Sequence, residues 1–546
     1  MRKVMVFLLM ITLVVPFFSP GVKADVSETK TLMVIPLDDR PVNLYVPEQI
    51  AEASGIKVIF PPREMLGRFT TPGDTKEIAQ WIKENAKKVD GFVVSTSMLA
   101  YGGLVASRTG VKSAEEAKET LSVLKEIHKE YPNKSMFVYD TIQRLAVTST
   151  NAESAKYYDM IREWAILYDR VHNFDYVEGK VRLEVLEKTI PAPVLEDYKV
   201  ARKRNHEINQ ELITWVKEGL IHYLILAQDD AAPYGVHRME REELLQQIKS
   251  DGVEDCVNLF PGADEVGAVL VSRFAAEVYN VHPSIFVTYT GMPGSEWIAA
   301  FEDTTFDVNV NKHIIAAGGT VTDDVKKADI HLLINTPATN GGDHSSDINR
   351  LVSMAKKDLN QKQNVIIGDV LYVNKADREL VTKLRSDVSL PSLLSYSGWN
   401  TAGNAIGLAL GHGISRYSFM HHPFGFGVPL YEKAAKANYE YLLFRFAKDD
   451  GYKNTVYPNS IAYIKSLGAD ANNLGSYYDI VNSYVQKELT KEAQEWYQAF
   501  DNKTVEIGKR GQHTFTKRIT GLQSVHVQLP WPRVFESELE PELNLK

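Results

Sequence analysis

Two adjacent carboxylates, Asp229 and Asp230, are the strongest catalytic candidates in the sequence. They follow an apolar run over residues 223–228. Such a pair can divide its work: one carboxylate stabilises a developing positive charge, and the other acts as general acid because its neighbour and partial burial raise its pKa. This arrangement suits glycosidases that use the substrate's own 2-acetamido group as nucleophile. The alternative is that the two residues form a turn or cap a helix.

A second acidic pair, Asp264 and Glu265, lies between an apolar run and an apolar helical segment over 266–278. Glu265 is a catalytic candidate, and Asp264 is a substrate-binding candidate. We favour helix capping for this pair, with Asp264 as N-cap and Glu265 in the first turn.

Further polar and aromatic residues that follow apolar runs are predicted to bind substrate. An aspartate beside an arginine suits hydroxyl or carboxylate recognition, and three converging arginines would favour an anionic substrate. Two amides spaced i, i+4 on one helix face suit hydroxyl or acetamide groups. The candidates are Asp38, Asp39, Arg40, Asn43, Tyr101, Arg108, Asp140, Arg144, Asp264, Trp399, Asn400 and Asn404. Internal ion pairs and core packing are the alternatives.

The sequence favours neither a metal nor a cofactor. The histidines are scattered, and the group Asp343, His344 and Asp347 also suits a solvated loop. There is no Walker loop, no dinucleotide-binding glycine fingerprint and no Gly-x-Ser-x-Gly elbow. We therefore predict no cofactor and no metal site.

The candidates follow short apolar runs that alternate with helical segments, a pattern that indicates parallel sheets covered on both faces. The expected strands lie at 32–37, 57–60, 91–94, 136–139, 221–227, 257–260, 284–289, 329–334, 364–367 and 393–396. Ligands of such folds bind where the parallel strands end. Ten strands are too many for one eight-stranded barrel. We therefore expect a TIM-like, barrel-like α/β domain over 25–305, a smaller α/β domain over 306–450 and a helical C-terminal region with a Pro-rich tail over 451–546. One extended doubly wound sheet is the alternative.

Composition and net charge argue against some classes of protein. The chain has 546 residues, 44% of them hydrophobic, and a formal charge of −9, which argues against a nucleic-acid binder. Arg2 and Lys3 precede an apolar run over 4–18, so we expect a secretory signal cleaved after Ala24, with no stable membrane span thereafter. Cys256 is the single cysteine, which rules out an intramolecular disulfide.

Six segments together resemble the domain-of-unknown-function 4127 family of secreted bacterial proteins. They lie at 37–43, 101–108, 140–144, 228–235, 261–267 and 396–404. The likeness spans essentially the whole chain after the signal, and it implies no reaction. Separately, the Asp229-Asp230 segment is similar to the acid pair of O-GlcNAcase-type glycosidases. That likeness implies that Asp229 orients the acetamide and that Asp230 is the general acid/base.

We therefore expect a secreted glycoside hydrolase that acts on N-acetyl amino sugars or another extracellular glycan by a substrate-assisted, retaining mechanism. A non-catalytic extracellular carbohydrate or solute receptor could use the same groups, and a metal-dependent hydrolase is the third alternative. Acids contributed by several strands around one pocket would favour the enzyme over the receptor. The sequence does not decide the oligomeric state.

Overall fold

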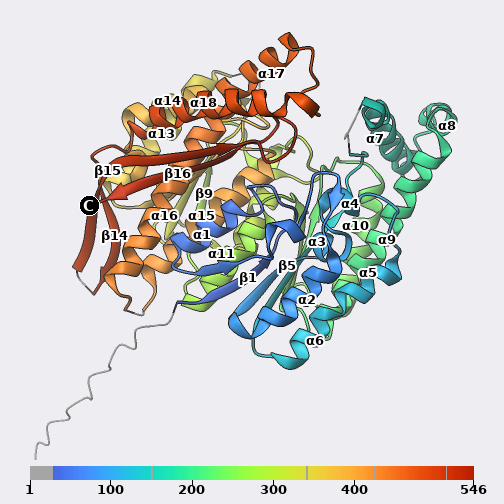
Figure 1. The fold of residues 1–546 in the computed structure, drawn as a ribbon, viewed down its shortest axis with the longest axis horizontal. Coiled ribbons are helices and arrows are strands. Elements are labelled where there is room, and N and C mark those ends of the chain that lie inside the picture. The colour runs from blue at the N-terminus through green and yellow to red at the C-terminus, as the bar shows by residue number, and fades with distance from the viewer. Residues whose placement is uncertain (1–28, 149–151, 340–341, 424, 512) are drawn as a thin grey trace, which may run out of the picture.

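A computed structural model describes residues 29–148, 152–339, 342–423, 425–511 and 513–546 (Figure 1). The expected signal peptide, residues 1–24, lies outside the described residues. Within them, no helix is both long and apolar enough to cross a membrane. The α/β class expected from the sequence is confirmed, and each of the ten expected strands overlaps a strand of the structure.

The first sheet has six strands, which pair in parallel in the order β2-β1-β5-β6-β7-β8. The strands are β1 (Thr31–Ile35), β2 (Lys57–Ile59), β5 (Gly91–Ser95), β6 (Ser135–Ile142), β7 (Tyr223–Gln228) and β8 (Val257–Pro261). Both faces are covered: in β1, Leu32 and Val34 join one apolar cluster, whereas Met33 and Ile35 join another. This two-sided burial explains the continuous apolar runs.

The second sheet has five parallel strands in the order β10-β9-β11-β12-β13. They are β9 (Ser284–Tyr289), β10 (Thr320–Val321), β11 (Ile330–Asn335), β12 (Asn364–Asp369) and β13 (Ser395–Ser397). Relabelled by chain order, the second sheet runs 2-1-3-4-5, and the first sheet begins in the same way. In this doubly wound arrangement, ligands bind beyond the strand ends, near the point where the strand order reverses.

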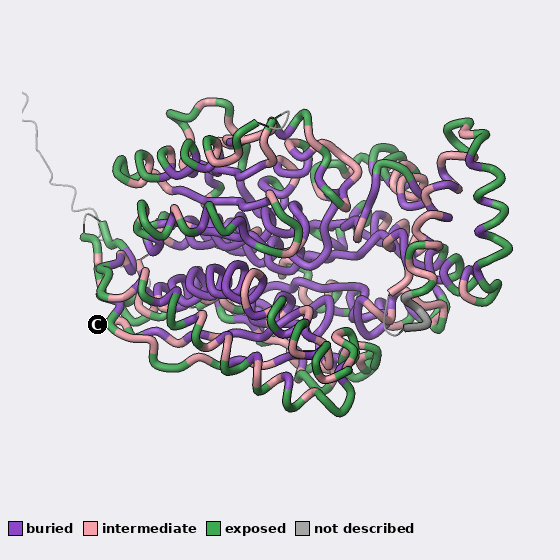
Figure 2. Tube along the Cα trace, turned by 90° about the horizontal axis from the view of Figure 1, so that it is seen from above, coloured by how far each residue is buried: buried purple, intermediate pink, exposed green. Residues whose placement is uncertain are grey.

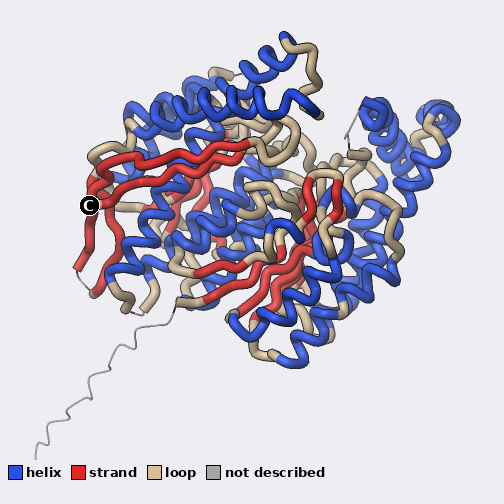
Figure 3. The backbone as a smooth tube through the Cα atoms, viewed as in Figure 1, coloured by secondary structure: helices blue, strands red, loops and turns tan. Residues whose placement is uncertain are grey.

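The parallel sheets are open, which corrects the barrel-like expectation. The order of the first sheet leaves β2 and β8 at opposite edges, so its strands do not close into a barrel. The single extended sheet that was the alternative does not form either, because the strands divide between two sheets. The second sheet begins at β9, before the domain boundary expected at 305. Figure 3 shows the strand groups in red.

Helices cover both faces of the first sheet. One face packs against α2 (Thr75–Asn85), α3 (Thr96–Tyr101), α5 (Ala114–Leu121), α6 (Val123–Glu130), α9 (Ala192–Lys217) and α10 (Val236–Asp251). The other packs against α1 (Tyr45–Ala53) and α11 (Val266–Tyr279), and α11 packs on α15 (Ala402–His421). The second sheet adds α12 (Phe306–Ala316), α13 (His344–Asn360) and α14 (Arg378–Asp387). One apolar cluster thus joins the two sheets.

Two short elements and a helical insertion complete the N-terminal half. The hairpin β3 (Gly67–Arg68) and β4 (Thr71–Pro72) and the short α4 (Leu104–Ser107) lie among the connections of the first sheet. The helices α7 (Ala152–Asn173) and α8 (Gly179–Thr189), with α9, separate β6 from β7. Figure 2 shows the buried interior in purple and the largely exposed outer part of this insertion in green.

The C-terminal region is helical, as expected, and it adds an antiparallel sheet. Its helices are α16 (Val428–Phe446), the π-helix η6 (Ala447–Val456), α17 (Tyr457–Ser466) and α18 (Tyr478–Tyr497). The sheet pairs β14 (Thr504–Arg510), β15 (His513–Gln528) and β16 (Glu538–Leu545). Residues 529–537 connect β15 to β16, and we call them the strap.

Candidate functional site

A cavity of about 350 Å³ lies where the strands of the first sheet end, at its carboxyl edge. Its wall combines residues that follow β1, β6, β7 and β8 with residues from the second half of the chain and the strap. The charged residues in the wall are Asp38, Arg40, Arg108, Arg144, Asp229, Asp230, Asp264 and Arg533. A small-molecule site has this size and position in doubly wound folds.

Arg40 is the centre of a buried ion cluster. Its guanidinium lies 2.7 Å from Asp38 Oδ2, 2.5 Å from Asp264 Oδ1 and 2.9 Å from Glu536 Oε1. The same guanidinium lies over the Trp531 ring, 5.3 Å from its centroid. Arg40 thereby joins the ends of β1 and β8 to the strap, which fixes the relative position of three parts of the wall.

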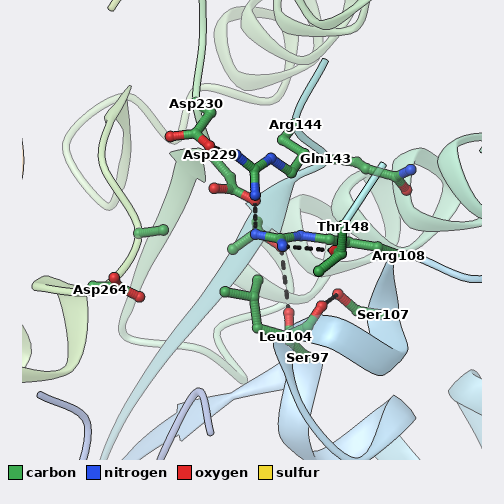
Figure 4. Close-up of polar contacts among 12 residues, drawn as sticks. Ser97, Leu104, Ser107, Arg108, Gln143, Arg144, Thr148, Asp229, Asp230 and Asp264 are labelled. Atoms are coloured by element: carbon green, nitrogen blue, oxygen red, sulfur yellow. Dashed lines mark hydrogen bonds and ion pairs between the residues drawn. The ribbon is translucent and has the colours of Figure 1, made fainter. Parts of the chain in front are cut away.

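The pair that the sequence singled out lies on the opposite side of the wall, where each aspartate meets one arginine. Arg108 donates from Nη2 to Asp229 and from Nη1 to Thr148 Oγ1 at 2.9 Å. Arg144 forms an ion pair with Asp230. Figure 4 shows both guanidinium groups beside the two carboxylates, with Asp264 apart from them.

Burial and neighbouring charges shift the pKa values of two wall carboxylates in opposite directions. Burial raises the pKa of Asp264 to about 6, with Asp38 and Glu536 adding to the rise and Arg40 opposing it. At Asp229 burial acts in the same direction, but Arg108 and Arg144 outweigh it and lower the pKa. Two carboxylates with divergent pKa values suit an acid and an anion.

The structure brings many of the predicted residues to the cavity. Those that line it are Asp38, Arg40, Arg108, Arg144, Asp229, Asp230, Asp264, Asn400 and Asn404. Asn400 donates to Asp264 Oδ2 at 3.0 Å, and Asn404 Oδ1 accepts from the Asp264 backbone N–H at 3.1 Å. The helical spacing expected for the amides is absent at Asn400, which precedes α15, although both amides do reach Asp264.

The other predicted residues lie behind the wall. Glu265 is fully buried and contacts His313 Nε2 at 3.1 Å, beneath the turn at Gly262. Asp140 accepts from Asn209 Nδ2 at 2.8 Å, and burial raises its pKa to about 6.

Asn43, Asp39, Tyr101 and Trp399 also lie outside the cavity lining. Asn43 donates to Asp38 at 2.8 Å, and Asp39 accepts from Trp531 Nε1 at 2.6 Å. Tyr101 lies under the Arg204 guanidinium, and Trp399 is buried near Lys448. Asn43 and Asp39 thus support two wall residues, Asp38 and Trp531, from behind.

Unusual backbone conformations gather at the cavity. Four non-glycine residues of its wall have a positive φ: Asp230 at 42°, Phe301 at 67°, Asn374 at 68° and Asn400 at 69°. Asparagine tolerates this region, but a bulky side chain such as Phe301 rarely adopts it. Such conformations cluster at functional sites, where the surrounding structure imposes them.

The strap supplies residues that sequence analysis missed: Trp531, Arg533 and Phe535 line the cavity. Local sequence gives no signal for this, because the strap meets Arg40 from the far end of the chain. Other wall residues that were missed include Thr148, Tyr158, Gln228, Asn374, Thr401 and Asn472.

The π-helix η6 fixes the strap by bonding its backbone carbonyls. Lys448 Nζ donates to Ser537 O at 2.6 Å, Lys453 Nζ donates to Phe535 O at 2.5 Å, and the Tyr452 hydroxyl donates to Val534 O. In a π-helix, residues five apart stack on one face, which brings Lys448 and Lys453 to neighbouring strap carbonyls. These bonds anchor the strap where it lines the cavity.

Comparison with known proteins identifies the chain only at the level of its family. Over the described residues, no group of three or more His, Cys, Asp or Glu side chains is placed to hold a metal ion. A search of curated proteins returned no match. A family model described as a protein of unknown function (DUF4127) matches residues 32–540. The chain therefore belongs to the DUF4127 family.

Proposed function

We propose that the protein is a glycoside hydrolase whose site is the cavity at the carboxyl edge of the first sheet. The observation that supports this most is the convergence of carboxylates from three strand ends: Asp38 after β1, Asp229 and Asp230 after β7, and Asp264 after β8. A receptor needs amide and aromatic contacts, whereas glycoside cleavage needs an acid and an anion around one bond.

Asp264 is the proton donor in this proposal, and Asp229 is the anion. Burial raises the pKa of Asp264 to about 6, which suits proton donation near neutral pH. The neighbouring arginines keep Asp229 ionised despite its burial, so it can stabilise positive charge that develops at the sugar carbon. In this proposal the general acid is therefore Asp264, at the end of the adjacent strand, and not Asp230, which pairs with Arg144.

The proposed substrate is an N-acetyl amino sugar, cleaved with the substrate's acetamide as nucleophile. Such a reaction needs one proton donor and one group that orients the acetamide, and Asp229 suits the second task. The amides Asn400 and Asn404 lie next to Asp264 and can bind the sugar hydroxyls. The local likeness to O-GlcNAcase-type glycosidases at Asp229-Asp230 is a prediction from the sequence.

The test is kcat for Asp264→Asn and Asp229→Asn on aryl N-acetylglucosaminides with good and poor leaving groups. Asp264→Asn should lower kcat by about 10²-fold or more with the poor leaving group and by less with the good one, because proton donation matters less there. Asp229→Asn should lower both rates. Asp324→Asn, which alters a surface ion pair with Lys327, is the control. Lack of hydrolysis by the wild type on any glycan would contradict the proposal.

A non-catalytic carbohydrate receptor is the second candidate, and one observation favours it. Asp38 and Asp264 contact Arg40, Asp229 contacts Arg108, and Asp230 contacts Arg144. Carboxylates that are already paired suit stable binding. Sugar binding by the wild type without turnover would favour the receptor over the enzyme.

We also propose export of the protein, on the basis of the N-terminal sequence. Arg2, Lys3 and the apolar run over 4–18 are typical of a secretory signal. N-terminal sequencing of protein collected outside the cells should begin at Asp25. Retention of residues 1–24 on cytosolic protein would contradict this prediction.

A further inference from the structure

The formal charges of the residues that line the cavity sum to zero. Four arginines and four aspartates form its charged wall, and Tyr158 is the remaining titratable side chain there. The sequence suggested that converging arginines would select an anion. The pairing of each guanidinium decides whether that charge is available to a ligand.

Each lining guanidinium already contacts a carboxylate. Arg40 lies 2.5 Å from Asp264 and also contacts Asp38 and Glu536. Arg533 reaches the same Glu536 at 3.3 Å. The cations on this side are therefore compensated within the protein.

The opposite side of the cavity shows the same pairing. Arg108 contacts Asp229, and both side chains are more than nine-tenths buried. Arg144 contacts Asp230, and these two side chains are 16% and 25% exposed. This second pair is the one that a ligand reaches most easily.

An ionic ligand would have to compete with these pairs. A carboxylate would displace an aspartate from its arginine and leave that aspartate uncompensated in a buried wall, which is costly. An ammonium group would leave an arginine unpaired in the same way. A hydroxyl can donate to a carboxylate and accept from a guanidinium without breaking their pairing.

The uncharged part of the wall suits the same kind of ligand. Asn374, Asn472 and Gln228 add neutral donors and acceptors, and Trp531 and Phe535 add apolar faces. Gln228 Oε1 and Asn374 Oδ1 are buried acceptors without a hydrogen-bond partner among the described residues, and the Nε–H groups of Arg108, Arg144 and Arg533 are buried donors without one. A hydroxyl group can donate to the former and accept from the latter.

We propose that the cavity binds an uncharged sugar unit, a neutral hexose or an N-acetylhexosamine, and discriminates against the corresponding uronate and free amino sugar. This inference rests on the proposed function for the statement that the ligand is a sugar. The charge preference itself is argued from the ion pairs, and it is an alternative to the anionic substrate that converging arginines would favour.

The test uses matched methyl glycosides that differ at one group: glucoside, N-acetylglucosaminide, glucuronide and glucosaminide, together with the galacto series. Binding to the purified protein is measured by calorimetry at pH 7.5, above the pKa of about 6 that burial gives Asp264. At least one neutral probe should bind about tenfold or more tightly than its charged counterparts. Equal or tighter binding of the glucuronide or glucosaminide would overturn the inference and leave the proposed hydrolase intact. Binding of no probe would contradict both.

Two charge variants sharpen the test. Asp230→Asn leaves Arg144 unpaired, so the ratio of glucuronide to glucoside affinity should rise about tenfold. Arg144→Gln leaves Asp230 unpaired and should instead raise the ratio of glucosaminide to glucoside affinity. Asp324→Asn should change neither ratio. The two reciprocal shifts distinguish a charge effect from a loss of folding, which would weaken binding of every probe. Unchanged ratios in both folded variants would overturn the role of this pair.

Discussion

At the carboxyl edge of the first sheet, charged side chains line a cavity, whereas the polar side chains at the ends of β11 and β12 in the second sheet bond to one another. Asn335, at the end of β11, donates to Asp369 at 3.0 Å and to Asp377 at 3.1 Å. Asp369 also accepts from the Tyr396 hydroxyl at 3.0 Å, and His344 contacts Asp377 at 2.8 Å. These side chains thus form a hydrogen-bond network within the protein.

The comparison shows that strand order brings polar groups to the carboxyl edge of each sheet but does not determine whether those groups face a cavity or bond to one another. Both sheets reverse their strand order near the first strand, and both end in aspartates and asparagines. At the second edge, bonds within the network occupy both carboxylates, Asp369 and Asp377. At the first edge, side chains from the strap and from the loop before α15 stand across from the strand ends and leave a space. A ligand site therefore depends on the connections that face the edge.

The largest expected effect is a loss of unfolding free energy on replacing Arg40, whose ion pairs join the parts of the cavity wall. Arg40→Met leaves Asp38, Asp264 and Glu536 buried without their shared cation. Loss of one partner of a buried ion pair costs about 3–5 kcal/mol of unfolding free energy. Urea denaturation measures the loss, and Lys30→Met, in the exposed pair with Asp90, should cost about 0–1 kcal/mol. Similar costs for the two variants would show that the cluster does not hold this edge.

The second prediction separates the two edges by function. Asn335→Leu removes a donor from both Asp369 and Asp377 and should cost about 1–3 kcal/mol of unfolding free energy. Sugar binding by the folded protein should persist, because Asn335 lies outside the cavity lining. Asn404→Leu, at the cavity edge, should weaken sugar binding instead. Loss of binding in Asn335→Leu would break the proposed separation.

The third prediction uses the pH dependence of stability to test the hydrogen-bond network of the second sheet. Burial, and then the charge of Asp377, raises the pKa of Asp369 to about 7 from its ordinary value of 3.8. The folded state therefore holds this proton more tightly than the unfolded state, so the stability contribution is complete below pH 4 and is lost as pH rises to about 7. A rise of the pKa from 3.8 to about 7 corresponds to a decline of about 4 kcal/mol, which Asp369→Asn should flatten. A pH profile of unfolding free energy identical to that of the wild type would contradict the assignment.

The smallest expected effect tests backbone strain at the cavity edge. Asn374 has a φ of 68°, which glycine adopts freely and alanine does not. Asn374→Gly should change the unfolding free energy by less than about 1 kcal/mol, whereas Asn374→Ala should destabilise by about 1–2 kcal/mol. Thermal unfolding of the two variants provides the comparison. Greater stability of the alanine variant would argue against a strained cavity edge.

The sequence predicted the strands and many wall residues because both depend on local patterns. Apolar runs must form buried strands, and residues that follow parallel strands must gather at one edge. Barrel closure was wrong because an apolar run predicts a strand but does not tell which strands pair, so the open edges at β2 and β8 were not apparent from the sequence. The direction of each side chain was equally hidden: Asp264 faces the cavity, but Glu265, the next residue, is buried beneath it.

The strap escaped prediction for a different reason. Trp531 and Arg533 reach the cavity only because β15, β16 and η6 fix their connection against the first sheet. Nothing within a few residues of Trp531 specifies a contact with Arg40. Long-range pairing of this kind depends on the whole fold and leaves no periodic pattern in the sequence.

The contact between Arg40 and Glu536 joins positions that are 496 residues apart. Synthesis proceeds from the N-terminus, so the first sheet can assemble while the strap has yet to be made. The ion cluster around Arg40 is therefore completed only after Glu536 has been synthesised, long after Asp38, Arg40 and Asp264. A chain interrupted before the strap would have the strands of the first sheet and an unfinished cavity. Ligand binding would thus report that the polypeptide had been made through residue 536.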